Sequence, residues 1–144
     1  MRRMLHACFL LALGIWGIPA GGAGAAQMPE AGVWLTEDKA AVMVVRPCGD
    51  KLCAAIQKVN VQVPGGVPRD VKNPDPKLRG RALAGVAILS DVERSGQEWS
   101  GGKIYVPRTG SSYSARVKLL AADRLSVQGC MMTICRGEVW SRIK

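Results

Sequence analysis

The sequence predicts an all-β protein, folded as a single up-and-down antiparallel β-barrel of about eight strands. From Gly32 onward, short apolar runs alternate with turn residues at fairly even spacing, which is typical of strands joined by short connections. The sequence contains no convincing amphipathic helix. An all-β chain of this size has to hide its sheet edges, and successive strands joined by short turns favour closure into a barrel.

The expected strands follow the apolar runs in chain order. They cover residues 33–36, 41–45, 54–61, 83–92, 98–106, 113–119, 125–129 and 138–143. In the segment 113–119, apolar and polar residues alternate strictly, which is the period of a half-buried strand. The run 83–92 is almost continuously apolar, as expected for a strand that is covered on both faces.

Residues 1–26 have the pattern of a Sec-type secretory signal peptide. Arg2 and Arg3 precede an apolar stretch, and small residues at 23–26 provide a cleavage site. We therefore expect a periplasmic or secreted protein whose single domain is residues 27–144. No other segment approaches the length of a membrane span, so we predict no transmembrane segment in the mature chain.

The mature chain is poor in the side chains that most often catalyse reactions. Cleavage would remove the only histidine, His6, and with it the commonest general base. It would also remove Arg2 and Arg3, which lowers the formal charge from +9 to +7. We assign no catalytic residue, metal or cofactor, and regard a non-enzymatic protein as the better interpretation.

The four mature cysteines form two identical C-x4-C pairs, Cys48 with Cys53 and Cys130 with Cys135. Disulfides are the default in an exported chain. Of the three possible connectivities we favour 48–53 and 130–135, because each pair encloses turn-like residues. A zinc site of four thiolates is the alternative, but its usual spacing is C-x2-C.

The segment 70–81 differs from the rest of the chain. It has two prolines, two carboxylates and several basic side chains but no apolar period, so it predicts an ordered loop rather than a core strand. Residues 74–79 can form one helical turn, with Asn73 or Asp75 as its cap. Asp70 and Asp75 either hold the loop through caps and pairs with Arg79 and Arg81, or form the carboxylate pair of a hydrolase.

Several sequence fragments together resemble a known bacterial family of small exported proteins, the domain-of-unknown-function family numbered 2147. They are Gly32-Val33-Trp34, residues 47–53, 70–75, 78–81 and 99–105, Gly129-Cys130, and Val139-Trp140-Ser141-Arg142. The resemblance covers nearly all of residues 32–143, and Ala54 departs from it where glycine is expected. It implies a lipocalin-like β-barrel and no established activity.

Aromatic residues near the two chain ends suggest how the barrel closes. Gly32-x-Trp34 and Trp140-x-Arg142 resemble the lipocalin closure, in which an early tryptophan packs under a late arginine. We assign Trp34, Trp140 and Arg142 a structural role, with ordinary core packing of the aromatics as the alternative.

The strand expected at 98–106 offers a second candidate surface. Trp99, Lys103 and Tyr105 share the parity of Gly101, so one face would display two rings and an ammonium, a combination suited to a flat ligand. Core packing of the two rings is the alternative. Gly101-Gly102 itself is more plausibly a bulge or close backbone approach than a phosphate loop.

The leading functional hypothesis is an exported barrel that binds a small or amphipathic ligand at a mouth bordered by the 70–81 loop. The net positive charge favours an anionic ligand, and export excludes nucleic acid as a partner. The predicted ligand contacts are Asp70, Lys72, Asn73, Asp75, Arg79, Arg81, Trp99, Lys103 and Tyr105. Small residues at Ala55, Gly85, Ala87 and Ala115 are expected to leave the cavity open. The alternatives are an envelope module that binds polymers or lipid head groups through its basic surface, and a carboxylate-based hydrolase.

Overall fold

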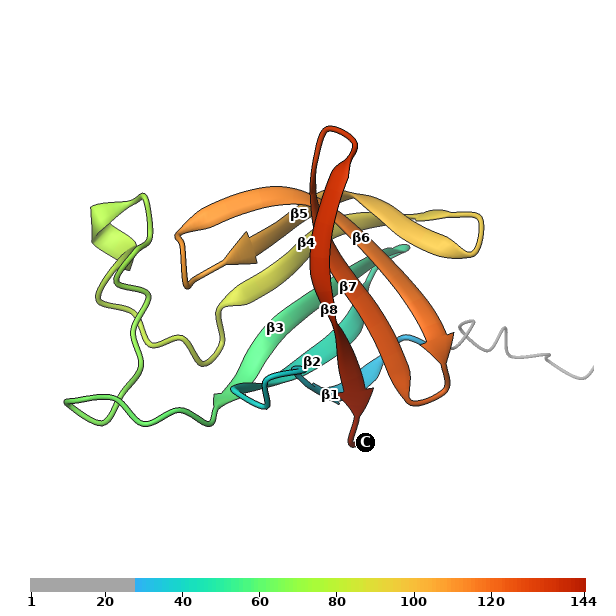
Figure 1. Cartoon of the computed structure of the whole chain (residues 1–144). Coiled ribbons are helices and arrows are strands. Elements are labelled where there is room, and N and C mark those ends of the chain that lie inside the picture. Colours follow the sequence, from blue (N-terminus) through green and yellow to red (C-terminus); the bar gives the residue numbers. More distant parts are fainter. Residues whose placement is uncertain (1–27) are drawn as a thin grey trace, which may run out of the picture.

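The structure, a computed structural model, describes residues 28–144. The predicted signal peptide therefore lies outside the described residues. Eight antiparallel strands close into one barrel in which each strand pairs with its neighbours in sequence and β1 pairs with β8 (Figure 1). The predicted all-β, up-and-down barrel is confirmed. Its strands are β1 Gly32–Leu35, β2 Ala41–Cys48, β3 Lys51–Val59, β4 Ala87–Ser95, β5 Glu98–Val106, β6 Ser111–Ala121, β7 Arg124–Met131 and β8 Ile134–Arg142.

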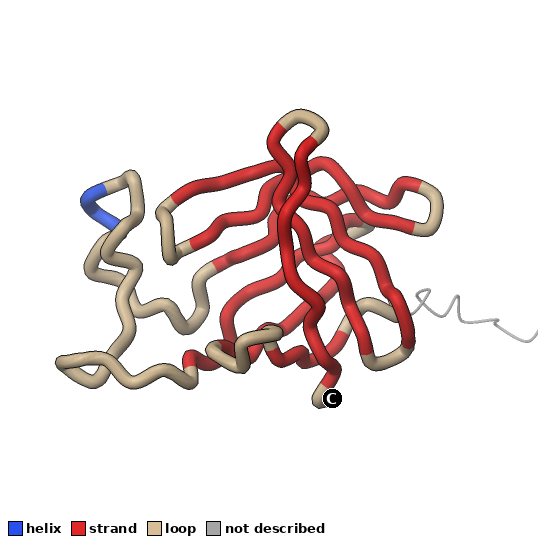
Figure 2. Tube along the Cα trace, viewed as in Figure 1, coloured by secondary structure: helices blue, strands red, loops and turns tan. Residues whose placement is uncertain are grey.

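The connections divide the barrel into two unlike ends. We call one end the mouth: it carries the β1–β2, β5–β6 and β7–β8 turns and the long β3–β4 loop, residues 60–86. The other, the closed end, carries the start of β1, the three remaining turns and the end of β8. Figure 2 shows that the long loop is the main irregular segment of the described chain. It contains one short helical turn, η1 (Pro76–Leu78).

The core fills the barrel interior towards the closed end. Its most deeply buried side chains include Trp34, Leu52, Val92, Val117 and Leu125, each with essentially no exposed surface. They come from five different strands, as expected when inward-facing residues alternate along every strand of a small barrel. The interior of the closed half is therefore filled by buried apolar side chains.

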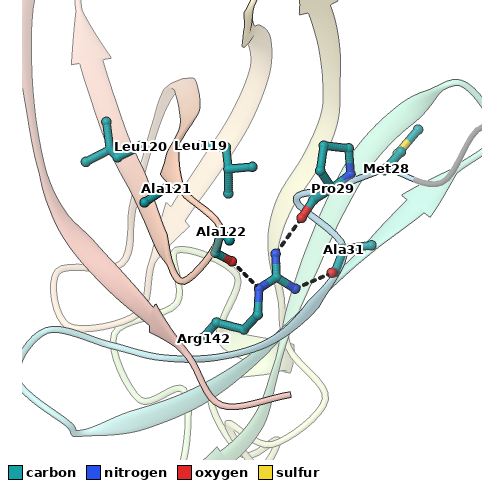
Figure 3. A pocket seen from close by; sticks show the side chains of 8 residues that line it. All are labelled: Met28, Pro29, Ala31, Leu119, Leu120, Ala121, Ala122 and Arg142. Atoms are coloured by element: carbon teal, nitrogen blue, oxygen red, sulfur yellow. Dashed lines mark hydrogen bonds between the residues drawn. The ribbon is translucent and has the colours of Figure 1, made fainter.

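Arg142 seals the closed end. Its guanidinium lies over the Trp34 ring, 4.1 Å from the ring centre, and donates to the backbone carbonyls of Pro29, Ala31 and Ala122 (Figure 3). Gly32 makes this arrangement possible, because a Cβ at that position would collide with the Arg142 side chain. The packing of a late arginine on an early tryptophan is the one expected from the sequence.

The strand predicted at residues 83–92 begins later than expected. The apolar run 83–92 is not one strand, since β4 begins only at Ala87. Gly85 has a φ of +90°, and Val86 N–H closes a turn on the Leu83 carbonyl. Residues 83–86 thus end the long loop and pack against the barrel as a turn.

The two predicted disulfides are present, Cys48–Cys53 and Cys130–Cys135. Each closes a hairpin that is tighter than expected, so β3 begins at Lys51 and β8 at Ile134 rather than after the bridge. One disulfide staples the closed end and the other staples a hairpin at the mouth. Within residues 28–144, no helix is long and apolar enough to cross a membrane.

Candidate ligand-binding cavity

A cavity of about 1520 Å³ opens at the mouth of the barrel. All four connections of the mouth contribute to its wall, together with the adjoining strand ends. The lining includes Ala40 from the β1–β2 turn, Leu83 from the long loop, Pro107 from the β5–β6 turn and Met132 from the β7–β8 turn. The barrel therefore has a buried core towards the closed end and an open cavity at the mouth.

The inner part of the cavity is apolar. Ile104, Tyr113, Val127 and Trp140 line it where it meets the core. Gly129, which also lines the cavity, has no side chain to fill it, and a Cβ there would press against Ile104 and Tyr113. An apolar interior of this kind favours a ligand with a hydrocarbon or ring portion.

Polar groups near this apolar wall are already paired. The Trp140 Nε1–H donates to Glu138 Oε1 over 2.6 Å, so the indole keeps a hydrogen-bond partner at the edge of the core. Glu37 Oε2 accepts from the Val139 backbone N–H at 3.0 Å. Both acids line the cavity, and both have a local structural partner.

Four basic side chains lie around the cavity: Arg69, Lys72, Arg108 and Arg136. Arg108 pairs with Asp38 at 3.0 Å. The backbone N–H of Ala40, the Thr36 hydroxyl and Arg108 together lower the pKa of Asp38, which keeps this acid ionised in the β1–β2 turn. Arg69, Lys72 and Arg136 form no ion pair with any of residues 28–144. Arg69 donates to the Gly80 backbone carbonyl, whereas Lys72 and Arg136 remain available to an anionic group.

A buried carboxylate anchors the long loop that borders the cavity. The Asp70 side chain has no exposed surface. Its Oδ1 accepts from the Tyr105 hydroxyl at 2.5 Å, and its Oδ2 accepts from Arg81 at 2.8 and 3.0 Å and from Asn73 at 2.8 Å. We call this group, Asp70, Asn73, Arg81 and Tyr105, the loop anchor. It ties residues of the loop to β5.

The hydrogen bonds of the loop anchor decide which groups carry charge. Burial alone would raise the pKa of Asp70, but the hydrogen bonds from Tyr105, Asn73 and Arg81 outweigh it and lower the pKa. Burial and the adjacent Asp70 carboxylate raise the pKa of Tyr105, so its hydroxyl stays protonated as a donor. The anchor is thus an ionised acid held by three donor side chains.

Local contacts shape the rest of the loop. Asp75 caps η1 by accepting from the Lys77 N–H at 2.9 Å, and Arg79 Nε donates to the Asn73 carbonyl at 2.8 Å. Gly110 of the β5–β6 turn packs directly on the Lys72 carbonyl, where any side chain would clash. The β3–β4 loop and the β5–β6 turn therefore form one continuous part of the rim.

Comparison with known proteins identifies the family. Residues 32–142 match the family described as "Uncharacterized protein conserved in bacteria (DUF2147)". The chain belongs to this family. No curated protein gives a significant match.

A solved structure supports the fold of this DUF2147 member. Protein HP1028 from the human pathogen Helicobacter pylori, described as belonging to the lipocalin family, superposes with a TM-score of 0.68 and 23% sequence identity. The match covers 79% of this chain and 82% of HP1028. At this identity the likeness establishes a lipocalin-like barrel, as the sequence resemblance implied, and nothing about the ligand.

Eight of the nine predicted ligand contacts lie outside the cavity lining. Only Lys72 lines the cavity. Asp70, Asn73, Arg81 and Tyr105 form the loop anchor, while Asp75 and Arg79 hold the loop's own backbone. Six of the nine predicted contacts therefore shape the rim.

The predicted display of Trp99, Lys103 and Tyr105 on one face is wrong. The register of β5 against β6 shifts between Gly101 and Ile104, so a bulge reverses the alternation. Trp99 is buried in the core and Lys103 is exposed, whereas Tyr105 lies in the loop anchor. The expectation that the two glycines form a bulge is confirmed.

The small residues that were expected to leave the cavity open do not border it. Ala55, Gly85, Ala87 and Ala115 do not line the cavity. Ala115 is buried in the packed core, and Ala87 is exposed. Of the cavity residues that were not predicted, the largest group comes from the β7–β8 hairpin. The exposed apolar residues at 131–134 and Gly129 are the features of the sequence that indicated this group.

Proposed function

We propose that this protein is an exported, non-enzymatic β-barrel that binds a small amphipathic ligand in the mouth cavity. The observation that carries the proposal is the cavity itself, which combines an apolar inner wall with basic side chains at its rim. Pockets of this composition bury the apolar part of a ligand and fix its polar end with a few placed groups. Lys72 and Arg136 supply the positive charge for an anionic end.

Export is part of the proposal and is supported by the two disulfides. Such bridges form and persist in oxidising compartments. The signal peptide predicted at residues 1–26 is tested by N-terminal sequencing of the protein recovered from the periplasmic fraction, where we expect the chain to begin near Gln27. An intact Met1 in that fraction would contradict cleavage.

The carboxylate-hydrolase alternative gains no support from the geometry. Both oxygens of Asp70 accept hydrogen bonds from protein groups, and Asp75 caps η1. A general acid or a nucleophile needs an oxygen directed at the substrate. These two acids are instead used to hold the loop.

The test is direct binding of a single-chain anionic amphiphile, laurate, measured by isothermal titration calorimetry. We expect saturable binding with a negative heat-capacity change, the marker of apolar burial. Val59→Trp places a larger side chain on the cavity wall and should weaken binding at least about tenfold. The control Leu120→Trp changes an exposed residue at the closed end and should leave binding unchanged.

Equal binding by both tryptophan variants would contradict the proposal, because the ligand would then lie outside the cavity. A neutral amphiphile of the same chain length, dodecanol, tests the role of charge. Replacing Arg136 by alanine should reduce the preference for laurate over dodecanol. An unchanged preference would remove Arg136 from the proposed head-group site.

A further inference from the structure

The exposed apolar residues of the protein gather around the mouth. Nine large hydrophobic residues of the described chain are exposed, and five of them border the cavity: Val61, Val71, Met131, Met132 and Ile134. Met132, at the tip of the β7–β8 hairpin, is 97% exposed. Of the nine, only Leu120, near the end of β6, and Ile143, just after β8, lie at the closed end.

The β7–β8 hairpin is built to hold these residues out from the barrel. It projects beyond the neighbouring strands at the top of Figure 1, and the Cys130–Cys135 bridge ties its two strands just before the tip. Met131 and Ile134 flank the two-residue turn and are 65% and 67% exposed. A stiff hairpin with an apolar tip presents hydrophobic surface without the ordering cost of a flexible loop.

Basic residues accompany this apolar tip, and their charge is not neutralised locally. Arg136 lies two residues after Ile134, and Arg69 and Lys72 flank Val71 on the long loop. None of these three forms an ion pair within residues 28–144. Three acids also line the cavity. Asp38 pairs with Arg108, Glu37 accepts from the Val139 N–H, and Glu138 accepts from Trp140 Nε1–H.

We propose that the rim of the mouth docks on the surface of an anionic lipid bilayer, with the hairpin tip 131–134 and Val71 inserted among the head groups. Apolar side chains ringed by lysine and arginine fit such a surface, because the apolar groups enter the interface while the cations meet the lipid phosphates. A flat protein partner would span the mouth and leave the cavity beneath it empty, whereas a bilayer supplies the cavity with amphipathic molecules. The docking itself does not require the proposed ligand binding.

The test uses the mature protein and vesicles of phosphatidylcholine with or without phosphatidylglycerol. The three described tryptophans are buried, so Met132→Trp adds an exposed reporter. We expect its emission to shift to shorter wavelength only with anionic vesicles, and the binding to weaken when NaCl is raised from about 0.05 to about 0.5 M. Equal binding to neutral vesicles, or no shift with either, would overturn the proposal.

Matched variants locate the surface. Met132→Ser with Ile134→Ser should reduce binding to anionic vesicles about tenfold or more, whereas Leu120→Ser with Ile143→Ser should leave it unchanged. The reverse order of effects would overturn the proposal. So would a dimer of the unmodified protein that the tip variant converts to a monomer, because the tip would then be an interface between two copies.

The cavity-blocking variant Val59→Trp separates this docking from ligand binding. It leaves the tip unchanged, so it should still bind anionic vesicles although laurate binding is weakened. Loss of vesicle binding in this variant would overturn docking by the rim and would indicate that lipid enters the cavity instead. Vesicle binding without any laurate binding would support docking while contradicting the proposed function.

Discussion

An arginine side chain organises each end of the barrel, but one end is closed and the other is open. At the closed end, Arg142 places its guanidinium on Trp34 and on three carbonyls, next to the buried core. At the mouth, Arg81 places its guanidinium on Asp70 and so holds a loop beside a large cavity. An arginine closes the barrel at one end and keeps the rim in shape at the other.

The contacts that stabilise the whole barrel lie at the closed end, and the candidate binding cavity lies at the mouth. The closed end joins β1, β8 and the β6–β7 turn, so its loss opens the whole barrel. The loop anchor joins one connection to β5, so its loss opens a local segment. Elements that border binding sites are generally drawn from the less stable parts of a fold.

Replacing Arg142 by alanine should have the largest effect on stability. It removes the contact with Trp34 and the donors to Pro29, Ala31 and Ala122, and we expect the free energy of unfolding to fall by about 3 kcal/mol. Urea denaturation followed by tryptophan fluorescence measures it. Arg142→Lys should recover less than half of the loss, because an ammonium cannot reproduce the planar fork; full recovery would show that charge alone closes the end.

Replacing Asp70 by asparagine should loosen the loop more than the barrel. We expect the free energy of opening residues 60–86 to fall by about 2 kcal/mol, since Arg81 and Tyr105 lose an ionised acceptor. Hydrogen exchange followed by mass spectrometry resolves the loop from the strands. Tyr105→Phe, which removes one of the donors, should cost about 1 kcal/mol, and equal loss of protection throughout the barrel would contradict a local role.

Acid should affect the mouth before the closed end. The pKa of Asp70 is lower in the folded protein than its usual value, so its stabilising contribution is complete above about pH 4 and is lost as the pH falls through the folded-state pKa. Asp38 in the β1–β2 turn shifts in the same direction. Hydrogen exchange, corrected for intrinsic rates, should show faster exchange at residues 60–86 below about pH 4, and Asp70→Asn should abolish most of that change.

The smallest effect on stability is expected at the hairpin tip. Met132 is almost fully exposed, so Met132→Ser should change the free energy of unfolding by no more than about 0.5 kcal/mol. Urea denaturation measured in parallel with Arg142→Ala checks this. A loss comparable to that of Arg142→Ala would mean that the tip is part of the folded core and not a free rim.

The sequence by itself determined the architecture of this protein because the relevant signals are local. Alternating apolar residues and short turns specify antiparallel neighbours, and cysteines five positions apart across a turn specify their own bridges. The sequence also narrowed the cap of η1 to Asn73 or Asp75, of which the structure uses Asp75. The packing of Arg142 on Trp34 was expected from the resemblance of the two chain ends to the lipocalin closure. The location of the irregular 70–81 loop was also predicted correctly.

Only the tertiary structure decided which residues form the site. The bulge after Gly101 reverses the parity of Tyr105 relative to Trp99, and a one-residue shift moves a side chain to the opposite face of a strand. The burial of Asp70 depends on Tyr105, 35 residues away in the chain. The cavity is walled by four connections that are distant in sequence and meet only because the barrel closes, so no local pattern could have identified the lining as one set.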